Sequence, residues 1–188
     1  MIDSGKTKTA GNQVADYLGS ETLNGVGGLS SIDLLYITHY DSDHIGGLPR
    51  IVERGIRIRK AFDQGISGRR SMLTRNNNPT VYSKYVAAVG DPNNNQRQDA
   101  NEPNFVRHKL HYGHIENIGQ RDHIEIRTVS VRGDTEGTAH DDDLDPQNKG
   151  LTFDENPGSI ALMIRLGEFE FYTAGDQTDN DWKSKPGV

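Results

Sequence analysis

A buried strand that runs into a cluster of histidines and aspartates is the feature that most restricts how this chain folds. Residues Ile32 to Thr38 are almost continuously apolar, which is typical of a strand covered on both faces. The strand stops at the segment His-Tyr-Asp-Ser-Asp-His-Ile-Gly-Gly, residues 39–47. A loop that follows a strand end and closes with a Gly-Gly turn holds its side chains close together. Carboxylates and imidazoles crowded there repel one another unless a cation neutralises them.

Four residues of this segment are candidate metal ligands, namely His39, Asp41, Asp43 and His44. At this spacing His39 and Asp41 could bind one ion, and Asp43 and His44 a second. A fifth candidate, Asp176, follows another expected strand, and its carboxylate could bridge two cations about 3.5–4 Å apart. The alternative is a polar surface turn with incidental histidines. We favour the metal site because candidate ligands follow two separate strand ends.

The composition favours a single soluble domain, residues 1–188, with much of its length in loops. Hydrophobic residues make up only 32% of the chain, which also has 21 glycines and 7 prolines. Because there is no cysteine, disulfides, thiolate zinc ligands and cysteine nucleophiles are excluded. No apolar run approaches the roughly 18–20 residues that cross a bilayer, and no secretory signal is visible at the N-terminus. The net charge of −6 disfavours a protein that coats duplex nucleic acid, while a local basic surface stays compatible with it.

The order of the expected elements indicates a mixed α and β class. We predict a helix over 9–18, the start of a helix at 48–53 and a helix over 80–89. The last of these has Asn78 as its cap, Pro79 in its first turn and Gly90 at its end. We predict strands over 32–38, 56–62 and 123–131, and a hairpin of 159–166 with 169–173. Two polar stretches, 91–103 and the acidic 133–156, are expected to be exposed loops.

Basic side chains and three further histidines leave alternatives open. The basic residues close together in sequence are Arg50, Arg54, Arg57, Arg59, Lys60, Arg69, Arg70 and Arg75. Beside a metal site they could hold a phosphate backbone, or they could simply point outward from a strand and a loop. His108, His111 and His114 are either additional ligands or exposed residues of a polar hairpin.

The segment Thr38 to Gly47, Thr-His-Tyr-Asp-Ser-Asp-His-Ile-Gly-Gly, resembles the Thr-His-x-His-x-Asp-His-x-Gly-Gly signature of the metallo-β-lactamase superfamily. Asp41 replaces the second histidine, which is similar to the branch that contains the ComEC-type DNA-uptake proteins. Residues 2–5, 156–163 and 172–176 resemble, in the same order, the early Asp-x-Gly turn, the Asn-x-x-Ser strand and the strand ending in Gly-Asp. The resemblance implies an αββα sandwich of two mixed sheets with the metals at one edge.

Against the family pattern we expect an incomplete domain, truncated at both ends. The chain begins inside the first motif and stops before the family's last histidine. The histidine of the third motif is also missing from Glu155-Asn156-Pro157-Gly158-Ser159. Asn156, or else Glu155, is therefore a candidate additional ligand.

The resemblance implies a metal-dependent hydrolase, and within that class we favour a phosphodiesterase or nuclease acting on nucleic acid or another phosphodiester. Asp43 would be the catalytic residue that holds the nucleophilic water, and Asp176 would bridge two divalent ions. Because carboxylates outnumber imidazoles in this set, we prefer Mn²⁺ to Zn²⁺. Hydrolysis of a lactone, thioester or β-lactam, and a non-catalytic metal-binding or interaction domain, are the alternatives. The likeness also points to an extracytoplasmic location.

Overall fold

The strands sort into separate sheets according to the part of the chain to which they belong. The computed structural model describes residues 1–20, 28–65, 74–75, 78–89, 106–119, 123–131 and 158–177. The chain divides into two compact units, Met1–Leu110 and His111–Val188. Helices and strands are both present, so the predicted mixed α and β class is confirmed.

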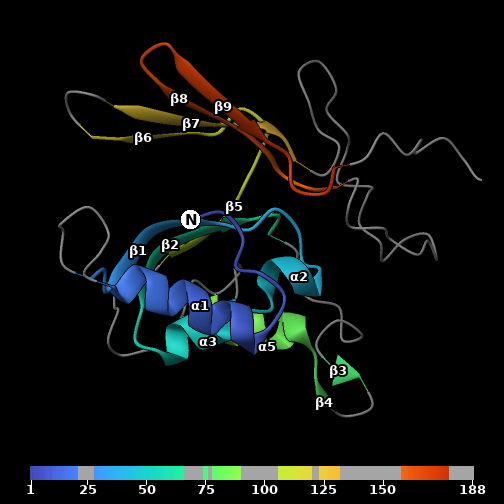
Figure 1. Ribbon diagram of the computed structural model, residues 1–188. Helices are drawn as coiled ribbons and strands as arrows, with labels where there is room; N and C mark the ends of the chain where they lie inside the picture. The colour runs from blue at the N-terminus through green and yellow to red at the C-terminus, as the bar shows by residue number, and fades with distance from the viewer. Residues whose placement is uncertain are drawn as a thin grey trace, which may run out of the picture. The chain divides into compact units, whose positions relative to one another are not determined.

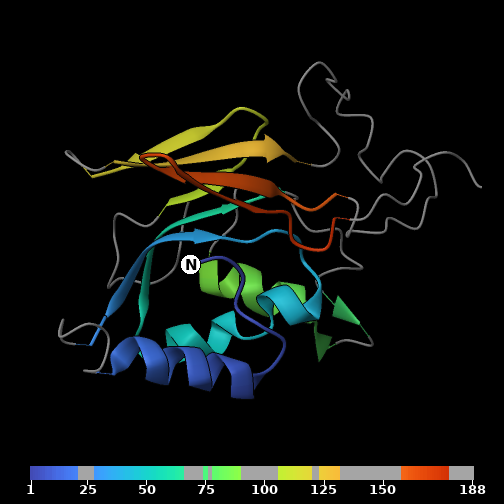
Figure 2. The same cartoon turned by 45° about the horizontal axis from the view of Figure 1, so that its top comes forward.

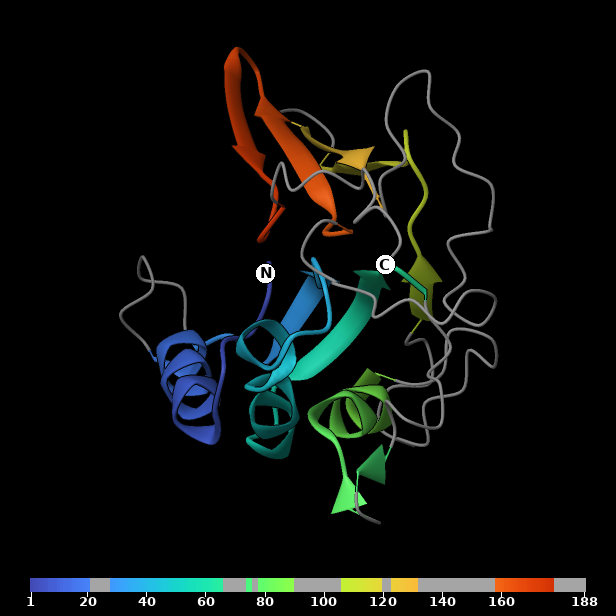
Figure 3. The same cartoon turned by 90° about the vertical axis from the view of Figure 1, so that its right-hand side faces the viewer.

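The first unit is built on a parallel sheet whose strands lie in the order β1-β2-β5 (Figure 1). These strands are β1 (Ser31–Tyr36), β2 (Arg57–Asp63) and β5 (Val106–Lys109). The helices α1 (Lys8–Gly19), α3 (Leu48–Glu53) and α5 (Val81–Val89) lie on the same side of this sheet (Figure 3). The short helix α2 (Ser42–Ile45) precedes α3, and together they form the crossover that parallel strands require. A small ladder joins β3 (Thr74–Arg75) to β4 (Asn78–Pro79).

Aliphatic side chains fill the space between this sheet and its helices. Leu35 of β1, Ile58 of β2 and Ile51 of α3 are fully buried in one cluster. On the other face of the sheet Tyr36 stacks on Phe62 with ring centroids 4.8 Å apart. Since both Leu35 and Tyr36 are buried, the second half of β1 is covered on both faces, as its apolar sequence predicted.

The second unit contains an antiparallel sheet in the order β6-β7-β8-β9 (Figure 2). Its strands are β6 (Ile115–Ile118), β7 (Ile124–Ser130), β8 (Ala161–Leu166) and β9 (Phe169–Thr173). The β8–β9 hairpin turns at Gly167, whose φ of +59° lies in the left-handed region that glycine adopts without strain. This is the hairpin predicted from the sequence.

The predicted helices and strands within the described residues are confirmed, with boundaries that shift by one or two residues. The predicted cap of the last helix is wrong. Asn78 and Pro79 form β4, and Thr80 caps α5 because its hydroxyl accepts a hydrogen bond from the Ser83 amide at 3.1 Å. The short polar strands β5 and β6 were not predicted, because neither has an apolar pattern long enough to identify it. The two predicted polar loops and Gly90 lie outside the described residues.

Among the described residues, none of the helices combines the length and the apolar character needed to cross a membrane.

Candidate metal centre

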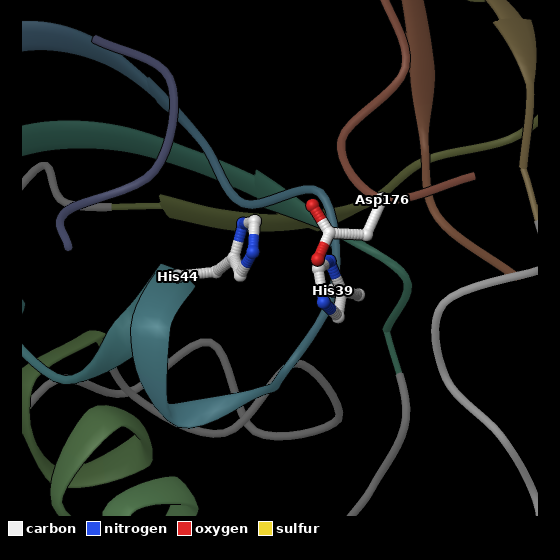
Figure 4. Close-up of side chains that lie close together, drawn as sticks. All are labelled: His39, His44 and Asp176. Carbon is white, nitrogen blue, oxygen red and sulfur yellow. The ribbon is translucent and has the colours of Figure 1, made fainter. Parts of the chain in front are cut away.

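The two histidines of the motif come from the end of β1 and from α2, and their rings lie against each other. Beyond β1 the chain stays beside β2 as far as Ile37, whose amide donates to the Phe62 carbonyl at 2.9 Å. It then turns into α2, where the carbonyl of Asp41 accepts from the His44 amide at 2.9 Å. As a result the ring centroids of His39 and His44 are 3.9 Å apart (Figure 4). The structure therefore brings together these two members of the predicted cluster, which the sequence analysis had assigned to two different ions.

Asp3 connects both histidines, although sequence reasoning did not include it among the site residues. Its Oδ1 accepts a hydrogen bond from the Thr38 amide at 2.8 Å. Its Oδ2 lies 2.8 Å from His44 Nδ1 and 2.9 Å from Thr38 Oγ1. Thr38 Oγ1 in turn lies 3.1 Å from His39 Nδ1. One carboxylate therefore orders His44 directly and His39 through a hydroxyl.

These contacts determine which nitrogen of each neutral imidazole carries the proton. A carboxylate only accepts, so His44 must donate to Asp3 from Nδ1, and the Thr38 hydroxyl must also donate to Asp3. Because that hydroxyl has a single proton, it accepts from His39 Nδ1–H. Both rings thus keep the lone pair on Nε2. A metal-ligating histidine has this arrangement when its other nitrogen donates to a carboxylate or a similar acceptor.

The N-terminal segment is held in place by close backbone packing against the Gly-Gly turn. Asp3 adopts a φ of +52°, a left-handed conformation that Asp tolerates better than most residues. The Ser4 amide donates to the His44 carbonyl at 2.7 Å, and the Gly47 amide donates to the Gly5 carbonyl at 2.8 Å. A Cβ atom at Gly46 would lie 2.1 Å from the Lys6 carbonyl oxygen. The two glycines of the motif are therefore needed for the approach that brings Asp3 to His44.

The two aspartates of the motif differ from the histidines in being exposed. His39 is fully buried, whereas the Asp41 side chain is 53% exposed, with Oδ2 3.8 Å from His39 Nε2. Two donors on one ion, each about 2.0–2.2 Å from it, lie roughly 3–3.5 Å apart, so a small rotation of Asp41 is enough for it to share a cation with His39. Asp43 is also exposed, in the first turn of α2.

The remaining sequence candidates lie in the second unit. Asp176 follows β9, beside Gly175 with its φ of +56°. Asn156 and Glu155 lie outside the described residues. His111 is exposed, and His114 lies in the turn before β6 with Nε2 3.8 Å from Glu116.

His108 and the basic residues of the first unit have other partners or positions. His108 belongs to β5 and its ring stacks on Phe62, so the three further histidines do not form one hairpin. Arg54 pairs with Asp16, and Arg50 donates to Asn12 and Glu53.

Arg57 and Arg59 lie near the start of β2. Arg57 pairs in register with Ser31, and Arg59 lies 3.3 Å from Asp33. They are thus at the end of the sheet opposite the histidines, since β1 alone spans roughly 17 Å from Ser31 to Tyr36 at about 3.3 Å per residue and His39 follows it. The structure favours the outward-facing interpretation for these two. Arg69, Arg70 and the side chain of Arg75 lie outside the described residues.

Comparison with known proteins adds no family assignment. No protein-family model matches the sequence, and no curated protein matches it significantly. The resemblance to the metallo-β-lactamase superfamily therefore stays a prediction, and the case for a function depends on the geometry around His39 and His44.

Proposed function

We propose that this chain is a metal-dependent hydrolase of the metallo-β-lactamase type, with His39 and His44 as its imidazole ligands. The observation that carries the proposal is the hydrogen-bond relay from Asp3, which places the lone pair of both rings on Nε2. For a purely structural role in the core, burial of the two histidines would be enough, and neither ring would need a particular tautomer. One carboxylate that selects the same tautomer in both, directly in His44 and through the Thr38 hydroxyl in His39, is the arrangement expected of metal ligands. The proposal includes the αββα sandwich, formed by the parallel and antiparallel sheets.

In this proposal the other ligands are carboxylates, which give the site a hard, oxygen-rich character. Asp41, whose Oδ2 lies 3.8 Å from His39 Nε2, would share an ion with it, and Asp43 would be a ligand from α2. Asp176 of the second unit would bridge two ions, with Asn156 as a further candidate. Carboxylate oxygens suit Mn²⁺, whereas imidazole-rich tetrahedral sites suit Zn²⁺. We therefore propose two divalent ions, with Mn²⁺ as the activating metal.

The proposed reaction is hydrolysis of a phosphodiester. A divalent ion held by the histidines and carboxylates would supply Lewis-acid chemistry, polarising the ester and making a water easier to deprotonate. Asp43 orients the attacking water and accepts its proton, and its exposure lets that proton pass to solvent. His39 is fully buried, so its imidazole is held in one orientation while the exposed carboxylates adjust. The water oxygen forms a bond to phosphorus, the P–O bond to the alcohol breaks, and the leaving alcohol takes up a proton from solvent.

The test begins with binding and then measures turnover. Metal-depleted protein is titrated with Mn²⁺ and with Zn²⁺ in a calorimeter, alongside His44→Gln and the exposed control His111→Gln. We expect His44→Gln to weaken binding by more than the 10–100-fold attributed to groups that only support a ligand, and His111→Gln to bind like the parent. Equal binding by all three proteins would overturn the ligand assignment.

Turnover separates the hydrolase from a non-catalytic metal-binding domain. The metal-loaded parent is assayed with bis(p-nitrophenyl) phosphate and with a lactone panel, and Asp43→Asn is assayed beside it. We expect phosphodiester turnover to fall in Asp43→Asn by a larger factor than metal affinity does, because the asparagine oxygen can still bind an ion but cannot accept the proton of the water. Metal binding without turnover of any ester would establish the non-catalytic alternative.

A further inference from the structure

A second polar cluster lies beside the segment that carries His39. Its side chains are less exposed to solvent than those of the candidate metal centre, where Asp41 is 53% exposed. Asp63 ends β2, Arg107 lies on β5 and Tyr85 lies on α5; Tyr40 directly follows His39. Relative exposure is 0% for Asp63, 2% for Arg107, 0% for Tyr85 and 5% for Tyr40. We call these four residues the Asp63 cluster. All four belong to the first unit.

The contacts of the cluster converge on the Asp63 carboxylate. Oδ2 accepts from Arg107 Nε at 2.6 Å and from the Tyr85 hydroxyl, while Oδ1 accepts from the Gly65 amide at 2.7 Å. The Arg107 guanidinium also lies over the Tyr85 ring, 5.2 Å from its centroid. Burial, and then the charge of Asp63, raise the pKa of Tyr85 well above its ordinary value. Tyr85 therefore stays a protonated donor to Asp63.

Such a cluster is poorly explained by stability alone. Removing a carboxylate and a guanidinium from water costs free energy that their attraction only partly returns, and apolar residues of similar volume often stabilise a core as well or better. What an ion pair with several directed hydrogen bonds adds is a defined geometry.

The geometry held here is that of the two residues that flank His39. Arg107 Nη2 donates to the Tyr40 hydroxyl at 3.3 Å, immediately after His39. Gln64, the residue after Asp63, donates from Nε2 to the Thr38 carbonyl at 3.1 Å, immediately before His39. The Tyr40 ring also packs edge-on against Tyr82, with centroids 4.8 Å apart. Hydrogen bonds therefore hold the residues on both sides of His39. Thr38 is bonded to the residue that follows β2, and Tyr40 is bonded to Arg107 of β5.

We propose that the Asp63 cluster is a positioning device that orients His39 for metal binding through Tyr40, with Gln64 supporting the same loop through Thr38. Arg107 and Tyr40 are positioning residues that do not ligate the metal. The proposal rests on the proposed function for its metal-binding consequence. Its effect on the His39 ring does not, because that effect is present without metal.

The test variant is Tyr40→Phe, which removes the hydroxyl that accepts from Arg107 and keeps the ring that packs on Tyr82. Tyr82→Phe is the matched control, since it removes a hydroxyl from the neighbouring buried ring. The first measurement is ¹⁵N NMR of the imidazole nitrogens in metal-free protein. We expect the parent and Tyr82→Phe to show His39 protonated at Nδ1. In Tyr40→Phe we expect a mixture of tautomers, because a His39 ring that moves away from Thr38 Oγ1 loses the acceptor of its Nδ1 proton.

The second measurement is the Kd for Mn²⁺ and for Zn²⁺ by calorimetry. We expect Tyr40→Phe to bind about tenfold more weakly, at the lower end of the range for groups that support a ligand, with a Tm equal to that of Tyr82→Phe. Arg107→Lys keeps the positive charge but loses the planar guanidinium group. We expect this variant also to show a mixture of His39 tautomers by NMR.

The two proposals fail in different ways. An unchanged His39 tautomer and an unchanged Kd in Tyr40→Phe would overturn the positioning proposal and leave the metal site standing. A parent that binds no metal, with a tautomer change in Tyr40→Phe, would overturn the proposed function and support the positioning of His39. A parent without metal binding and a variant without a tautomer change would overturn both.

Discussion

Replacing Asp3 by asparagine tests the relay that supports the proposed metal site. The Asp3 carboxylate accepts from three donors, the Thr38 amide, the Thr38 hydroxyl and His44 Nδ1. An asparagine amide has one acceptor oxygen. If that oxygen faces the Thr38 amide, the NH₂ group faces His44 Nδ1 and selects the tautomer with the proton on Nε2. If the amide is flipped, two N–H donors face each other at Thr38.

The expected loss of metal affinity follows from that tautomer change. Groups that hydrogen-bond to metal ligands contribute about 10–100-fold in affinity, which is about 1.4–2.8 kcal/mol. The side chains of Asp3 and His44 are only 18% and 15% exposed, so solvent screens the interaction little. We expect Asp3→Asn to be in the upper half of that range, because both imidazoles depend on the same carboxylate. The folded state also loses about 1.5 kcal/mol, the lower end for a hydrogen bond to a charged group.

The assay is calorimetric titration of metal-depleted protein with Mn²⁺ and with Zn²⁺, with thermal unfolding measured on the same samples. Asp33→Asn is the matched control, because the Asp33 side chain is 79% exposed and pairs with Arg59 on the first unit's sheet. We expect the control to match the parent in both measurements. An Asp3→Asn protein that binds either metal within threefold of the parent would refute the relay as a determinant of the site.

Three further changes test other parts of the structure. Gly46→Ala places a Cβ atom 2.1 Å from a backbone oxygen, so we expect a loss of about 1–3 kcal/mol in the free energy of unfolding by thermal melts, whereas Gly19→Ala, with nothing within 4 Å, should melt like the parent. Asp41→His makes the donor set softer, so we expect the metal that gives most phosphodiester turnover to change from Mn²⁺ to Zn²⁺, and an unchanged preference would show that Asp41 does not select the metal. Burial, and then Asp63, raise the pKa of Tyr85, so the stability it contributes is present below about pH 10 and is lost as the pH rises through the folded-state pKa. The tyrosinate absorbance that appears only on alkaline unfolding should therefore be smaller by one tyrosine in Tyr85→Phe than in the parent. An equal change on unfolding in the two proteins would contradict this.

Local patterns were enough to identify the elements of both sheets that carry an apolar signal. The apolar residues 32–38 and the polar segment after them predicted β1 and the loop that follows. A strand buried on both faces is apolar along its length and ends where polar residues begin. That His39 and His44 lie near each other was also predictable, since only five residues separate them in sequence. Neither inference needed information about distant parts of the chain.

Tertiary structure alone decided what surrounds that loop. Asp3 and His44 are 41 residues apart, and Asp63 and Arg107 are 44 apart, yet each pair is joined by a hydrogen bond. No local pattern identifies such pairs, because they depend on which strand ends are brought together and on the space left by Gly46. The basic residue Arg57 shows the converse: it follows the metal motif closely in sequence but lies at the opposite end of the sheet. A parallel strand starts at the edge away from the one where its neighbour ends, so proximity in sequence is not proximity in space.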